Sequence, residues 1–405
     1  MATVEPDNAS LQRNRHSFGR DVLGPILARF SRDLILYARS TPNPADTAIL
    51  FASRGGWRLE LATQLFATRT GYDFGGAITG RLMISRLLAM RAYLLTSDSA
   101  VEELARYSDG KTLGFVASLL SPPETVLPST SLLNEPVTID GIRRLVADNS
   151  ELGRLLRADL NNQHALVNAH LDELRAGRRN VLFVDTGLFG SMFRTLDDGR
   201  PDLETALIML GRCFYRTPLP YQRSRSFGLA FQTDRFRHSA PESSVIRHWY
   251  LFETMFEPPM PSITRLDALN DSNLPDTSPM NSPAVAERDN PFFAGIRDYI
   301  EALSAADLIA IDTAADRAAN RLARAILMPS ATDVTVLGIG PSEASPGDDD
   351  GMNSLIAIDG ASFSQKLASV RDAHWQEGQA RRAFPVSARL MLPAVALARI
   401  AAGIR

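Results

Sequence analysis

The chain has 405 residues, of which 45% are apolar and 22% charged, and its formal net charge is −3. This composition is typical of a globular protein, and the near-neutral charge argues against a nucleic-acid or anionic-membrane partner. The single cysteine, Cys213, excludes an intrachain disulfide and a zinc site built from several cysteines. No apolar run reaches the roughly 18 residues of a membrane span, and the polar N-terminus lacks the apolar segment of a signal peptide. We therefore expect a cytoplasmic protein of bacterial type.

In chain order, five short apolar segments alternate with helical patterns, and each segment has the length of a buried strand. These predicted strands are residues 47–52, 81–85, 181–185, 206–210 and 227–231. Helical patterns lie at residues 25–40, 57–68 and 139–176. Alternation of strands and helices predicts an α/β fold with a mainly parallel, doubly wound sheet.

Composition divides the chain into four parts: a flexible N-terminus, an α/β core with a helical insertion, a linker rich in Asn, Asp, Ser and Pro, and a helical C-terminal region. Their boundaries are residues 1–16, 17–265 with the insertion at about 87–176, 266–290, and 291–405. The acidic run at residues 348–350 lies in a loop of the last part, and its pattern is not that of a calcium site.

The stretch NVLFVDTGLFGSMFRTL, residues 180–196, joins a strand that ends in Asp185 to a glycine-bearing turn and a helix. Such a turn presents free backbone N–H groups to an anion, and the carboxyl ends of parallel strands are where open α/β sheets bind ligands. The residues of the predicted phosphate site are Thr186, Gly187, Leu188, Phe189, Gly190 and Ser191. The alternative is a tight turn whose glycines only relieve steric crowding, and spacing alone leaves both interpretations open.

A second glycine turn follows the strand at residues 47–52. It contains Arg54, Gly55 and Gly56, and a helix follows at once. This turn offers a guanidinium as well as backbone amides to an anion. Two such turns in one parallel sheet predict a ligand with two phosphate groups.

Both turns resemble those of type I phosphoribosyltransferases. The run ILFASRGGWRLELA is similar to the family's first glycine turn, and VLFVDTGLFGSMFRT is similar to its phosphoribosyl-diphosphate loop. The resemblance implies that Arg54, Gly55 and Gly56 face a diphosphate, that Asp185 faces the ribose and a magnesium ion, and that residues 186–191 surround the 5-phosphate. The family usually has two adjacent acids where this chain has Asp185 and Thr186, and its loop is about one residue longer.

A second resemblance covers residues 23–378. It is to the C-terminal domain of uncharacterised bacterial proteins of cell-surface polysaccharide loci, which carry a haloacid-dehalogenase-type hydrolase in front of that domain. The similar pieces, in chain order, are LGPILARF, LFASRGG, LMISR, VDTGLFGS, WYLFETMFEPPMPS and HWQEG. This chain lacks the hydrolase's aspartate-rich motif, so the resemblance implies a separate hydrolase as a partner and no phosphatase activity.

Three further parts of the sequence have both a functional and a simpler structural interpretation. Glu253 is either a base at the sheet edge or an acid on a helix surface, and Arg86 either adds a guanidinium to the same edge or opens a helix in solvent. The arginine-rich segment at residues 212–238 is either a polyanion site or a solvated loop, and the net charge favours the loop.

Together these features predict a phosphoribosyltransferase-like protein that binds a phosphorylated ribose or nucleotide and transfers at its anomeric carbon. The predicted catalytic residues are Asp185, Arg54 and Glu253, with Mg²⁺ held at Asp185. The alternatives are a non-catalytic nucleotide-binding module and a hydrolase or glycosyl-transfer enzyme of surface polysaccharide biosynthesis. Besides the phosphorylated ligand, the expected partners are a hydrolase or a second copy of the chain.

Overall fold

The computed structural model describes residues 8–213, 225–233, 241–258, 262–269, 275–276, 290–338, 355–358, 360–388 and 392. At its centre lies a five-stranded sheet in which every neighbouring pair of strands is parallel. The strands are β1 (Thr47–Ala52), β2 (Ile78–Leu82), β3 (Asn180–Asp185), β4 (Glu204–Cys213) and β5 (Ser226–Thr233). Their order across the sheet is β2-β1-β3-β4-β5. The predicted α/β class and the parallel pairing are therefore confirmed.

β2 lies three residues earlier than the segment 81–85 predicted from sequence. Met83 donates its backbone N–H to His170 Nε2 at 3.0 Å, and Ile84 donates its own to Ser53 Oγ at 3.2 Å. Because side chains take these N–H groups, residues 83–85 cannot continue the ladder with β1. Ser85 then caps the next helix by accepting from Leu88 N–H.

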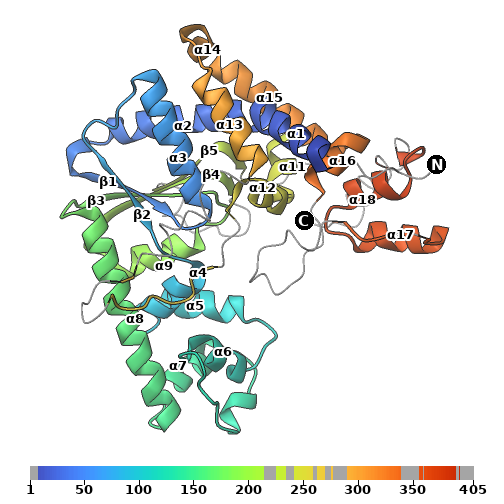
Figure 1. Cartoon of the computed structure of the whole chain (residues 1–405). Helices are drawn as coiled ribbons and strands as arrows, with labels where there is room; N and C mark the ends of the chain where they lie inside the picture. Colours follow the sequence, from blue (N-terminus) through green and yellow to red (C-terminus); the bar gives the residue numbers. More distant parts are fainter. Residues whose placement is uncertain are drawn as a thin grey trace.

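The sheet separates two apolar cores, because side chains of one strand alternate between its faces. In β1, Ile49 and Phe51 belong to one core and Leu50 to the other. The first core is covered by α2 (Gly24–Ser40), α3 (Gly55–Thr70), α11 (Pro241–Arg247), α12 (Trp249–Phe256), α13 (Pro291–Glu301) and α15 (Ile311–Leu327). The second is covered by α4 (Arg86–Tyr93), α8 (Glu151–Arg175) and α9 (Ser191–Gly199). Figure 1 shows these two layers on either side of the strands.

The predicted insertion is helical throughout its length. Three helices, α5 (Asp98–Tyr107), α6 (Leu113–Leu120) and α7 (Ile139–Ala147), form a lobe with α8 on the second face of the sheet (Figure 1). A break at residues 148–150 divides the pattern predicted for 139–176 into α7 and α8. The helices of this lobe begin at side-chain caps: Ser97, Thr112, Thr138 and Ser150.

The N-terminal segment differs from the prediction. Residues 8–16, expected to be flexible, lie in helix α1 (Asn8–Phe18), which packs on α13. Arg15 is buried and donates from Nε to Val336 O at 3.3 Å, in helix α16 (Ala331–Leu337). The helical propensity of NASLQRNRH is weak, so tertiary packing decides this element.

The C-terminal region contains α14 (Ala305–Ile309), α17 (Phe363–Asp372) and α18 (Gln376–Ala383) besides α13, α15 and α16. Much of the predicted linker 266–290, the acidic run at 348–350 and most of the apolar tail lie outside the described residues. In the part of the chain that the structure describes, no helix is long and apolar enough to cross a membrane.

Candidate active site

The two glycine turns lie side by side at the carboxyl edge of the sheet. β1 pairs with β3, so the turn at residues 53–56 and the turn at residues 186–190 leave the sheet from neighbouring strands. The strand order also changes direction here, since β2 lies on one side of β1 and β3 on the other. Open α/β sheets bind their ligands at such a switch point.

Four polar side chains meet at this switch point. Arg54 Nη2 lies 3.2 Å from Glu257 Oε2, and Thr186 Oγ1 donates to Glu257 Oε1 at 3.2 Å. The backbone N–H of Thr186 donates to Asp185 Oδ1 at 2.8 Å. The structure thus joins both predicted turns through a carboxylate, that of Glu257, which follows the last residue of α12.

Glu257 is held in place from the side of α3. Arg58 Nη1 donates to Phe256 O at 2.7 Å and to Glu257 O at 3.1 Å. Burial lowers the pKa of the Arg58 guanidinium to about 10, and the negative charge of Glu257 opposes this shift. A cation at the last carbonyl groups of a helix also interacts favourably with the helix dipole. The end of α12 is therefore anchored to the helix that begins at the first glycine turn.

Asp185 has an unusual acidity. Burial and, second, the negative charge of Glu257 raise its pKa from 3.8 to about 7, against the opposing effects of the Thr186 N–H and Arg54. Near neutral pH its carboxyl group can therefore hold a proton. Glu257 forms an ion pair with Arg54 at 3.2 Å. Neighbouring acids in different surroundings are a common arrangement for general acid and base catalysis.

The turn after β3 contains two glycines, and each has a steric reason. Gly187 has φ +130°, and a Cβ there would collide with Gly211 O, because β4 runs on past the end of β3. Gly211 donates to Thr186 O at 2.9 Å and Cys213 donates to Leu188 O at 3.1 Å. Gly187 is thus explained by close packing. Gly190, with φ +68°, is the left-handed residue that turns the chain into α9.

The same turn has unsatisfied donors. Among the described residues, the backbone N–H groups of Gly187, Leu188 and Gly190 find no acceptor. α9 begins without a side-chain cap, unlike the helices of the insertion. Phe189 and Gly190 also line a small cavity of about 30 Å³, which Arg194 and Asp197 of α9 line as well. Free backbone N–H groups at the start of a helix are suited to binding an anion.

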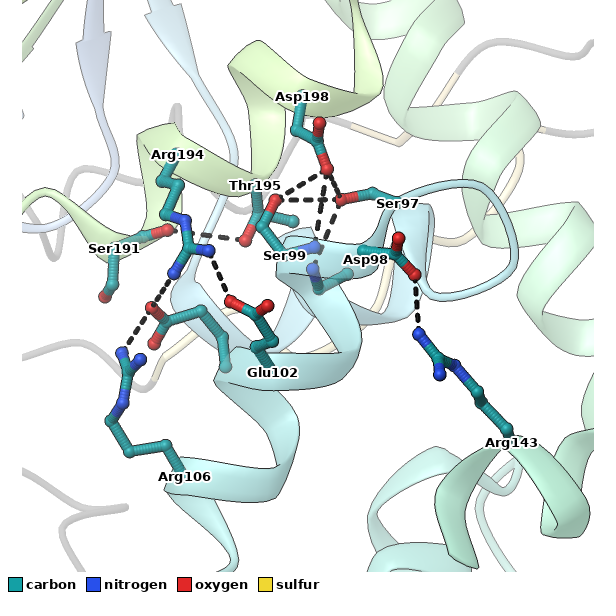
Figure 2. A network of polar contacts seen from close by, with 12 residues as sticks. Ser97, Asp98, Ser99, Glu102, Arg106, Arg143, Ser191, Arg194, Thr195 and Asp198 are labelled. Atoms are coloured by element: carbon teal, nitrogen blue, oxygen red, sulfur yellow. Dashed lines mark hydrogen bonds and ion pairs between the residues drawn. The ribbon is translucent and has the colours of Figure 1, made fainter. Parts of the chain in front are cut away.

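A polar network fixes α9 against α5, as Figure 2 shows. Arg194 on α9 forms an ion pair with Glu102 on α5. Asp198, one turn further along α9, accepts hydrogen bonds from the hydroxyls of Ser97 and Ser99 at the start of α5. Ser191 takes part through its backbone carbonyl, which accepts from Thr195 Oγ1 at 3.3 Å, whereas its hydroxyl bonds no described residue.

The oxygen atoms of this site suit a magnesium ion only if other groups complete its coordination shell. Among the described residues, no group of three or more His, Cys, Asp or Glu side chains could hold a metal ion. The carboxylates of Asp185 and Glu257 and the hydroxyl of Thr186 are oxygen donors, which Mg²⁺ prefers. Mg²⁺ commonly uses one or two carboxylates, with waters and substrate phosphates completing its shell. The residues therefore suit an ion that arrives with a phosphorylated ligand.

The remaining predicted residues lie at the periphery. Arg86 is the first residue of α4, and its exposed side chain forms no hydrogen bond or ion pair with a described residue. Glu253 lies one turn before Glu257 in α12, and its carbonyl accepts from Glu257 N–H at 2.6 Å. Sequence reasoning singled out Glu253 and passed over Glu257, although both lie in the segment WYLFETMFEPPMPS. The pair of prolines directly after Glu257, which ends the helix there, was the available signal.

Neither a protein-family model nor a curated protein matches this chain. The resemblance to phosphoribosyltransferases therefore rests on the two turns, and the ligand and reaction that it implies are proposals.

Proposed function

We propose that the chain binds a phosphorylated ribose or a nucleotide at the β1–β3 switch point and transfers at its anomeric carbon. The observation that carries this proposal is the joining of Arg54, Thr186, Asp185 and Glu257 beside a turn with unsatisfied N–H groups. The doubly wound, phosphoribosyltransferase-like topology belongs to the same proposal and is supported by helices on both faces of the sheet.

In this proposal each part of the site has one task. The turn at residues 187–191 and the start of α9 bind the phosphate through backbone N–H groups and the Ser191 hydroxyl. Asp185 and Glu257 bind the ribose hydroxyls. A transition state with oxocarbenium character gains from fixed carboxylates nearby, and a protonated Asp185 can supply the proton that a leaving group needs. Magnesium, when bound, would neutralise phosphate charge next to Asp185.

Isothermal titration with ribose 5-phosphate, with and without magnesium, tests the proposal. We expect saturable binding that Asp185→Asn weakens at least tenfold, whereas Asp109→Asn, at an exposed position beyond α5, leaves it unchanged. Absence of binding in the wild-type chain, under both conditions, would remove the basis of the proposal.

A non-catalytic nucleotide-binding module is the second candidate. Thr186 stands where phosphoribosyltransferases usually have a second acid, and its hydroxyl is already engaged by Glu257. This candidate predicts the same ligand binding with no consumption of any nucleotide on prolonged incubation. Release of a free base or of diphosphate from a bound ligand distinguishes the enzyme from the module.

A further inference from the structure

The carboxylate of Glu257 lies where the first glycine turn would receive a phosphate group. A Cβ placed on Gly55, the first residue of α3, would be 2.9 Å from Glu257 Oε1 and would also collide with Thr186 Oγ1. The other oxygen of the same carboxylate is the one that faces Arg54. Glu257 is therefore an internal anion at the N-terminus of α3, a position that favours negative charge.

The charges at this position leave little attraction for a second phosphate group. Arg54 is the cation of the turn, and its charge is balanced by Glu257 at 3.2 Å. Asp185, at the end of the neighbouring strand β3, is a second acid beside the same turn. Adding a diphosphate here would place like charges side by side, which is repulsive in a partly desolvated site.

The turn at residues 187–191 differs on each of these points. Its free N–H groups face no described acceptor, and α9 begins at Gly190 without a side-chain cap. No carboxylate of a described residue accepts a hydrogen bond from the backbone N–H groups of Gly187, Leu188 or Gly190. One anion position is thus closed by the protein itself and the other is open.

We infer that the ligand carries a single phosphate group, bound at residues 187–191, and that Glu257 excludes a diphosphate from the first glycine turn. This inference rests on the proposed function and narrows its ligand class. The donor is a 5-phosphorylated riboside, such as a nucleoside monophosphate, and not phosphoribosyl diphosphate. The diphosphate role that the resemblance implies for Arg54, Gly55 and Gly56 is replaced by an ion pair within the protein.

The test compares ribose 5-phosphate, inorganic diphosphate and phosphoribosyl diphosphate by titration into the wild-type chain and Glu257→Gln. We expect the wild-type chain to bind ribose 5-phosphate at least tenfold more tightly than inorganic diphosphate. Glu257→Gln removes the negative charge 3.2 Å from Arg54 and should raise the affinity for inorganic diphosphate at least tenfold. Glu204→Gln is the matched control, because this exposed residue begins β4 at the opposite edge of the sheet and should leave all three affinities unchanged.

The outcomes separate the two claims. If the wild-type chain binds inorganic diphosphate as tightly as ribose 5-phosphate, the inference is wrong and the proposed function stands. If Glu257→Gln weakens diphosphate binding, Glu257 assists such a ligand and the inference is again wrong. If none of the three ligands binds, the proposed function fails as well. The wild-type comparison decides the inference even if the variant does not fold.

Discussion

At the scale of single residues, the carboxyl group of Asp185 lowers the stability of the fold and is the kind of group that functional sites use. A carboxyl group that is buried beside another acid costs stability whenever it is charged. Natural proteins keep such groups mainly at functional sites, because elsewhere a neutral residue would serve better. The position of Asp185, at the carboxyl end of a central strand, agrees with that interpretation.

The acidity of Asp185 predicts a pH dependence of stability. Its pKa is raised from 3.8 to about 7, so between these pH values the folded chain keeps a proton that the unfolded chain releases. Stability therefore falls as pH rises through this window. Relative to wild type, Asp185→Asn should gain roughly 1–3 kcal/mol in free energy of unfolding between pH 4.5 and about pH 8. Urea unfolding at both pH values measures this, and a pH-independent difference would contradict it.

Asp185 could be selected from the sequence, whereas the only sequence signal for Glu257 was the pair of prolines after it. Asp185 belongs to a local pattern of strand, acid and glycine turn that a reader can recognise without a structure. Glu257 reaches the site only because Arg58, on α3, binds the end of α12 from about 200 residues away in the chain. Contacts of that separation leave no local pattern, so the neighbouring Glu253 was an equally reasonable choice.

At the scale of elements, the starts of helices divide into two kinds. The helices of the insertion begin at serine or threonine caps, which satisfy their first N–H groups. α3 and α9 begin at Arg54 and Gly190 with no side-chain cap, as do α2, α12, α15 and α18, but α3 and α9 start at the switch point. Their first N–H groups can therefore be satisfied there by water, by a ligand or by an internal anion.

Ser191→Asp separates stability from binding at α9. An acid in the first turn interacts favourably with the helix dipole and should raise the free energy of unfolding by about 0.3–1 kcal/mol. Thermal unfolding of the ligand-free protein measures this effect. A clear loss of stability would show that the turn does not present its N–H groups as described.

The segment at residues 262–269 is bound to the insertion by a buried charge network. Arg91 Nη2 donates to Asp159 Oδ2 at 2.6 Å and Arg265 binds the other oxygen of this carboxylate. Gln163 exchanges two hydrogen bonds with the backbone of Leu266. Burial lowers the pKa of Arg91, and its hydrogen bond to Asp159 opposes this effect. Asp159 therefore binds two arginines at once, one in α4 and one in the segment 262–269, which we call the strap.

Removing the Asp159 carboxylate should lower the stability of the fold. Asp159→Ala leaves the buried Arg91 without its counter-charge, and we expect a loss of about 3–5 kcal/mol in the free energy of unfolding. Asp109→Ala, at an exposed aspartate in the same lobe, should change it by less than about 0.5 kcal/mol. Urea unfolding of both variants measures the difference, and similar values for the two would contradict the role of the network.

At the scale of the whole molecule, the C-terminal helices are attached to the core through Trp375. This side chain is 0% exposed, and its Nε1 donates to Ile326 O at 2.9 Å at the end of α15. Trp375 is thereby a member of the first apolar core. α17 and α18 have a small core of their own, in which Val370 packs with Ala380 and Ala383.

Trp375→Ala should therefore loosen one part of the molecule more than the rest. Large core aromatics cost about 3–5 kcal/mol on truncation. We expect faster amide hydrogen exchange in α17 and α18, with β1 and β3 still protected. Phe363→Ala, at a side chain that is 71% exposed on α17, is the control and should change little. Equal deprotection of the sheet would mean that Trp375 supports the whole core.

The sheet could be predicted from the sequence because its signals are local. Each strand is a short apolar run with a turn or a helix on either side, and a parallel arrangement follows from the alternation. Both glycine turns could be expected at the carboxyl edge, but their adjacency depends on the pairing of β1 with β3, which alternation alone does not fix. Helix α1 and the 262–269 strap could not be predicted, because distant partners stabilise them through Arg15 and Asp159.

The central claim is that a phosphate group binds at the start of α9, and titration of ribose 5-phosphate into the wild-type chain and Ser191→Asp tests it most directly. The introduced carboxylate would occupy the phosphate position and repel the ligand. We predict saturable binding to the wild-type chain, no binding of unphosphorylated ribose, and at least a tenfold weaker affinity in a folded Ser191→Asp. Equal binding of ribose, or an unchanged affinity in Ser191→Asp, would contradict the claim.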